Sequence, residues 1–131
     1  MLPDPDLTDA QLAELVDRFY TNVRQDPLIG GLFERTISDW PTHLGKLTDF
    51  WSSVMLGTGR YHGSPMLAHL RHADTLTPEM FTRWLALWDE TAQSLFPPPV
   101  AARLHHKAAR IADSLQLGLR FHVDTSRKAT S

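Results

Sequence analysis

Apolar residues follow the helical period of about 3.6 along most of the chain, and no stretch alternates strictly enough to predict a strand. The first run of residues with this period is preceded by Thr8, with Gln11 three residues later, a spacing typical of a capping box at a helix start. Asp26 and Pro27 mark its end. Its apolar members fall on one face, at Leu12, Leu15, Val16, Phe19, Tyr20 and Val23. The pattern predicts an all-α domain.

The middle of the chain predicts a corner and two further helices. Residues 28–33 are short and glycine-bearing, which predicts a tight corner with one helical turn that delivers Phe33. Ser38 or Asp39 is expected to cap a helix that ends at 57–59, and Ser64 followed by Pro65 predicts a short helix. The longer helix has Leu44, Leu47, Trp51 and Val54 on its buried side, and the shorter one carries Met66, His69 and Leu70.

Two long helices follow. Thr77 and Pro78 predict the start of the first, and the prolines at 97–99 predict its end. Beyond these prolines the apolar spacing of Leu104, Ala108, Ile111, Leu115 and Leu119 predicts a last amphipathic helix. Residues 122–131 lack this periodicity and are expected to form a frayed tail, with residues 1–6 as the other flexible end. We therefore expect one domain over 1–131, with a core at about 7–121.

Composition narrows the function. The formal net charge is −2 and no basic patch stands out, so we expect neither nucleic-acid nor membrane-surface binding. The chain has no cysteine, which excludes disulfides, thiolate metal sites and cysteine nucleophiles. No apolar run approaches the roughly 20 residues of a membrane span, and the first residues lack a signal-peptide pattern, so a cytoplasmic protein is expected. Phosphate-binding, metalloprotease, hydrolase and dinucleotide motifs are also missing.

Four polar side chains share helix faces with apolar residues. From spacing alone, His69 is more simply a hydrogen-bonded core histidine than a metal ligand, and His43 is more simply a polar residue at the rim of its helix. Tyr20 and Trp84 fit the core, although the phenol hydroxyl and the indole N–H each need a partner. Together the four suggest a cavity with a polar occupant. Haem is one hypothesis, because it needs apolar walls, one axial nitrogen and donors on the opposite side.

The order of these residues resembles the truncated haemoglobins, and most closely group III. The resemblance covers about 7–121 and rests on the following elements: Phe19-Tyr20, Leu32-Phe33, Trp40 to His43, Phe50-Trp51 with Leu56-Gly57, Tyr61 to His69, and Phe81 to Leu85. The pair Gly30-Gly31 departs from it, because paired glycines are typical of the other truncated groups.

The resemblance implies a two-over-two helical sandwich around haem b, with His69 as the proximal iron ligand and Phe33 packing against the haem. It places Tyr20, His43 and Trp84 in the distal ligand pocket. It implies apolar haem contacts at Leu47, Phe50, Trp51, Leu70 and Phe81. Lys46, Arg71 and His72 are candidate partners of the haem propionates, and the simpler interpretation of each is an ordinary surface charge.

The function implied is binding of dioxygen, and of carbon monoxide, nitric oxide or peroxide, at a His-ligated iron. Nitric oxide detoxification or peroxide reduction would use the same iron and would need a reductase, which the sequence does not identify. One alternative is a haem-based gas sensor that acts through a separate partner. Others are a cofactor-free helical interaction module and a transition-metal binder using His69 with His72, or His105 with His106, although adjacent His105 and His106 cannot share a helix face.

Overall fold

The computed structural model describes residues 6–130, with side chains described as far as residue 121. Within these residues the chain is helical and has no strand. The helices in order are α1 (Asp9–Gln25), α2 (Gly30–Thr36), α3 (Trp40–Leu56), α4 (Pro65–Leu70), α5 (Pro78–Leu95) and α6 (Pro98–Thr130). The predicted all-α class is confirmed.

The predicted helix starts are confirmed by their caps. Thr8 and Gln11 form the reciprocal capping box of α1. Asp39, rather than Ser38, caps α3, and Ser64 and Thr77 cap α4 and α5, each through a backbone N–H three residues further on. These side chains satisfy N–H groups that have no acceptor within the helix.

Helix ends follow the expected chemistry, with one difference in α6. Gly57 ends α3 at φ 68°, a left-handed conformation that glycine adopts without steric cost. The prolines at 97–99 do end α5, but α6 begins among them, at Pro98. Proline is tolerated there because the first N–H groups of a helix have no internal acceptor.

The last helix is longer than the sequence predicted. It continues to Thr130, so helical backbone extends through residues 122–130, which the sequence placed in a frayed tail. The side chains of 122–130, and residues 1–5 and 131, lie outside the described residues. Asp6, placed in the N-terminal tail by the sequence, forms an ion pair with Arg103 of α6 at 2.8 Å.

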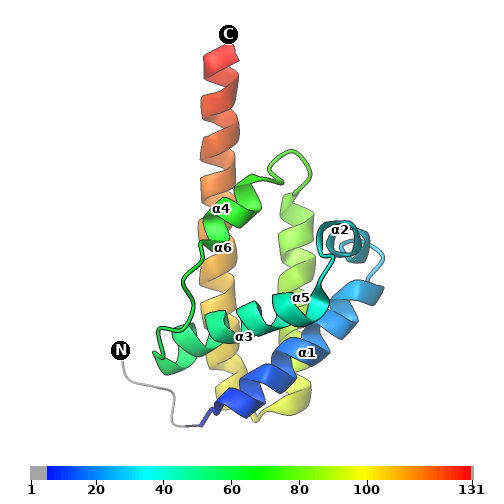
Figure 1. Ribbon diagram of the computed structural model, residues 1–131, viewed down its shortest axis with the longest axis vertical. Helices are drawn as coiled ribbons and strands as arrows, with labels where there is room; N and C mark the ends of the chain where they lie inside the picture. Colours follow the sequence, from blue (N-terminus) through cyan, green and yellow to red (C-terminus); the bar gives the residue numbers. More distant parts are fainter. Residues whose placement is uncertain (1–5, 131) are drawn as a thin grey trace.

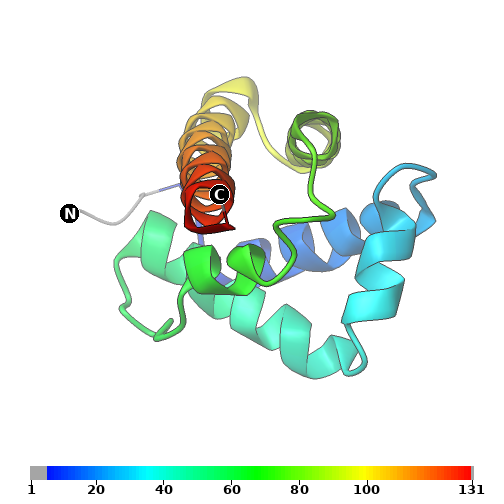
Figure 2. The same ribbon diagram turned by 90° about the horizontal axis from the view of Figure 1, so that it is seen from above.

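The helices form two layers. In Figure 1, α5 and α6 run antiparallel, and α1 and α3 cross them as a second pair; Figure 2 shows the two layers from above. The layers meet at Trp88 of α5, which is fully buried, stacks on Trp51 of α3 at 4.3 Å between ring centroids and meets Phe19 of α1 edge-on at 5.0 Å. Its indole N–H donates to the carbonyl of Leu104 of α6. This aromatic contact therefore joins all four long helices.

A short helix and a shared tryptophan position the candidate site. α4 packs against α6, beside a second apolar cluster that contains Phe81, Leu115, Leu119 and Leu70. Trp84 packs against both this cluster and the main core. Trp84 therefore connects the apolar surroundings of Tyr20 with the region around α4. In the described part of the chain, no helix has the length and apolar character needed to cross a membrane.

Candidate functional site

Tyr20 is the centre of an aromatic group drawn from three helices. It is buried on α1, with 5% of its surface exposed. The rings of Phe33 from α2, Trp40 from α3 and His43 from α3 lie 5.6, 6.0 and 5.9 Å from its ring centroid. The resemblance to the truncated haemoglobins predicts that Tyr20, Phe33 and His43 belong to one site. The structure places the three side chains in one cluster.

The Tyr20 hydroxyl is a neutral hydrogen-bonding group. Burial raises the pKa of Tyr20 to about 12, and a hydrogen bond with the Trp84 side chain partly offsets this rise. Because an indole has only a donor, Trp84 donates to the phenol oxygen. The phenol proton therefore stays available for donation to another group at any physiological pH.

His43 is also held in its neutral form. It is half-buried, and burial, followed by the nearby charge of Lys46, lowers its pKa below the ordinary value of 6.5. Its ring stands edge-on to Trp40 at 5.7 Å. A neutral imidazole can donate from one nitrogen and accept at the other.

Trp40 borders this aromatic cluster, although the sequence did not predict it as a site residue. It contacts both Tyr20 and His43, and the guanidinium of Arg24 lies 4.4 Å from its ring centroid. Arg24 in turn bonds to Glu34 of α2 at 2.5 Å. The spacing of Trp40 and His43, three residues apart on one helix, was the available signal. Arg24 and Trp40 thus support the outer side of the cluster.

His69 lies on α4, away from these residues along the chain. It is half-buried, and its Nδ1 lies 2.6 Å from the carbonyl oxygen of Pro65. Since a carbonyl only accepts, Nδ1 carries the proton and Nε2 keeps a free lone pair. Burial lowers the pKa of His69, the Pro65 carbonyl partly opposes this, and His72 adds to the lowering. The ring of Phe81 lies 6.3 Å away.

The residues predicted as apolar haem contacts fall into two groups. Leu47 and Phe50 of α3 are partly exposed at the margin of the main core, while Leu70 and Phe81 belong to the second cluster. Trp51 differs, because it is 2% exposed and stacked on Trp88. Trp51 lies in the core behind Phe50, whose ring it meets edge-on at 5.4 Å.

The remaining candidates lie at the surface. Lys46 and Arg71 are exposed, and His72 is half-buried. His105 bonds to Asp89 at 2.7 Å rather than to another histidine. Among the described residues, no group of three or more histidine or carboxylate side chains is arranged to hold a metal ion.

A buried carboxylate that the sequence did not single out anchors the corner beside the site. The Asp26 side chain is 1% exposed, forms an ion pair with Arg83 at 2.6 Å, and accepts backbone N–H bonds from Leu28 and Ile29. Burial alone would raise the pKa of Asp26, but Arg83 and the two N–H groups more than offset it and lower the pKa. Arg83 precedes Trp84, so this ion pair fixes the α1–α2 corner to the part of α5 that enters the site.

Comparison with known proteins places this geometry in context. A family model described as bacterial-like globin matches residues 8–114. A group 3 truncated hemoglobin from Campylobacter jejuni is 29% identical over 114 residues, which cover 84% of this chain and 89% of that protein. The crystal structure of a group III truncated hemoglobin from Campylobacter jejuni has a TM-score of 0.78 and 30% identity, and covers 90% of this chain and 95% of that one.

Proposed function

Because this chain belongs to the bacterial-like globin family and is similar to a group III truncated haemoglobin, we propose that it holds haem b on His69 and binds dioxygen beside Tyr20. A protein of this family is a haem protein that binds diatomic gases. The identity of the haem, the roles of the named residues and the preferred ligand are the proposal.

The donor set of the site fits haem. A macrocycle supplies most ligands of its iron, so the protein needs to add only one nitrogen and apolar walls. His69 offers one unprotonated Nε2, and the described residues offer no alternative cluster of metal ligands. Leu47, Phe50 and Leu70 are only partly buried, which leaves apolar surface for a flat ligand to cover.

On the proximal side, Pro65 is the positioning residue for His69. Its carbonyl accepts the Nδ1 proton and so fixes both the tautomer and the orientation of the imidazole. Burial lowers the pKa of His69, which keeps Nε2 deprotonated near neutral pH. The side chain is therefore ready to bind a metal without first losing a proton.

On the distal side, three donors come from three different helices. Tyr20, His43 and Trp84 lie on α1, α3 and α5. The His43 ring lies beside the Tyr20 ring, and the Trp84 side chain bonds to the Tyr20 hydroxyl. Haem, when bound, would supply the iron at which a polar diatomic ligand such as dioxygen gains partial negative charge. A phenol or indole donor to such a ligand forms a charge-assisted hydrogen bond worth about 1.5–3 kcal/mol. Carbon monoxide, which is less polar, gains less.

The observation that carries the proposal is this meeting of Tyr20 with Trp84 and His43 in a buried, aromatic environment. The same donors suit nitric oxide detoxification or peroxide reduction, both of which need a reductase partner. Lys46, Arg71 and His72 are the proposed propionate partners. A cytoplasmic location remains part of the proposal.

Haem uptake by the purified chain tests the proposal. Titration with haemin should saturate at one haem per chain and give a Soret band that shifts on reduction and on addition of carbon monoxide or dioxygen. Replacement of His106, an exposed residue of α6, by alanine is a control that should leave these spectra unchanged. A chain that takes up no haem would contradict the proposal and favour an interaction module.

A further inference from the structure

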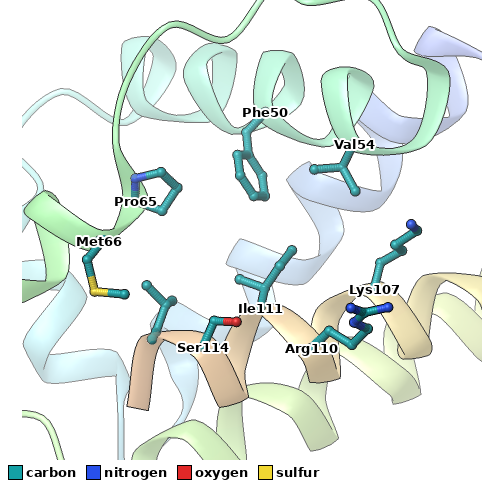
Figure 3. A pocket seen from close by; sticks show the side chains of 9 residues that line it. Phe50, Val54, Pro65, Met66, Lys107, Arg110, Ile111 and Ser114 are labelled. Atoms are coloured by element: carbon teal, nitrogen blue, oxygen red, sulfur yellow. The ribbon is translucent and has the colours of Figure 1, made fainter. Parts of the chain in front are cut away.

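A cavity of about 400 Å³ lies between α3, α4 and α6. Along α3 it begins at Phe50, two turns beyond His43, and along α4 it ends at Met66, one turn before His69. Figure 3 shows side chains from the three helices around this space. Most of its wall is apolar, formed by Phe50, Val54, Pro65, Met66, Ile111 and Leu115.

Two cations stand at this apolar wall. Lys107 and Arg110 line the cavity from α6, and the hydroxyl of Ser114 lies on the same helix face. Neither cation forms an ion pair with any of the residues from 6 to 121, whereas Arg83 and Arg60 pair with aspartates. The cavity therefore combines an uncovered apolar surface with positive charge that no described carboxylate balances.

We propose that this cavity binds a fatty acid, with the alkyl chain against Phe50, Val54 and Ile111 and the carboxylate facing Lys107 and Arg110. The size is adequate, since small-molecule pockets are commonly about 300–1,000 Å³. An inorganic anion would leave the apolar wall uncovered, and an uncharged alkane would leave the two cations without a partner. A carboxylate on an alkyl chain satisfies both features.

The site is next to the proposed haem site without depending on it. Phe50 and Pro65 are shared, because both line the cavity, while Phe50 is also a proposed haem contact and the Pro65 carbonyl positions His69. Lys107 and Arg110 have no role in the proposed function. A bound fatty acid should therefore occupy the cavity while haem remains on His69.

Calorimetric titration of the haem-loaded, carbon monoxide-bound protein with decanoate and with decanol tests the proposal. We expect one decanoate per chain. The double variant Lys107→Met, Arg110→Met should weaken decanoate binding by about fivefold or more, because exposed ion pairs contribute modestly and two are lost. It should leave decanol binding unchanged. Arg120→Met, an exposed cation on the same helix outside the cavity, is the matched control and should have no effect.

A variant of the wall gives a second measurement. Val54→Phe fills part of the cavity and should weaken binding of both decanoate and decanol, with folding checked by thermal melting. Absence of saturable decanoate binding, or equal loss in Arg120→Met, would overturn the proposal. Loss of the Soret band on saturation would also overturn it, since the cavity would then belong to the haem site. If the chain takes up no haem, the proposed function fails, and the same titration of the colourless chain still decides the fatty-acid site.

Discussion

Replacing Tyr20 by phenylalanine tests the distal pocket with the smallest change in shape. The ring stays and only the buried hydroxyl is lost, so contacts with Phe33, Trp40 and His43 are retained. A charge-assisted hydrogen bond of about 1.5–3 kcal/mol corresponds to roughly ten- to a hundredfold in rate. The Trp84 N–H, which bonds to the hydroxyl, is released and can donate to the ligand in its place. We therefore expect the lower end, an oxygen dissociation rate about tenfold faster.

Stopped-flow displacement of dioxygen by carbon monoxide measures this rate. Tyr61→Phe is the matched control, because Tyr61 is the other tyrosine of the chain and is outside the Tyr20 aromatic cluster. In a double-mutant cycle, Trp84→Phe should be non-additive with Tyr20→Phe, since the two groups share a hydrogen bond. The dissociation rate should not change between pH 6 and 9, because the Tyr20 phenol, with a pKa of about 12, keeps its proton. An unchanged rate in Tyr20→Phe would refute the distal role of its hydroxyl.

Three further predictions concern stability. Gly30→Ala should lower the free energy of unfolding by about 1–3 kcal/mol, because the new Cβ would lie 2.7 Å from a backbone carbonyl oxygen of α1. Gly45→Ala, whose new Cβ would have nothing within 4 Å, should raise the free energy of unfolding by about 0.5–1 kcal/mol. Urea unfolding of both variants checks this, and equal effects would contradict it. Asp26→Ala should lower the free energy of unfolding by about 2–4 kcal/mol, since the substitution leaves two N–H groups and a guanidinium without their acceptor. A loss under 1 kcal/mol in the same assay would show that the corner does not depend on Asp26. Folding lowers the pKa of His43 below 6.5, so the unfolded chain binds the proton more tightly. The free energy of unfolding should therefore fall as pH drops below about 6.5, and it should fall less steeply in His43→Gln. An identical pH dependence in the variant would contradict the burial of this ring.

Local features of the fold could be predicted because they depend on neighbouring residues. The caps at Thr8, Ser64 and Thr77 each use a side chain and an N–H three residues away, so a short stretch of sequence contains the whole interaction. The start of α6 could not be predicted in this way. Proline both ends and begins helices, and the sequence alone did not show that Pro98 does the second.

The candidate site was predictable only in part, for the same reason. Tyr20 and His69 drew attention because each is a polar group on an apolar helix face, but spacing alone favoured a core role for both. Their predicted roles in the site came from the resemblance to the truncated haemoglobins. Arg83 and Asp26 were not, because their ion pair joins residues 57 positions apart. Trp40 was not predicted as a site residue, since nothing local distinguishes a core tryptophan from one that borders a site.

The most direct test of the central claim is replacement of His69 by glycine, followed by addition of free imidazole. If His69 is the iron ligand, His69→Gly should lose the spectrum of the ferrous, imidazole-ligated haem, and millimolar imidazole should restore it. His72→Gly, three residues further on, should keep the original spectrum without imidazole. An unaltered spectrum in His69→Gly, or loss in His72→Gly alone, would contradict the assignment.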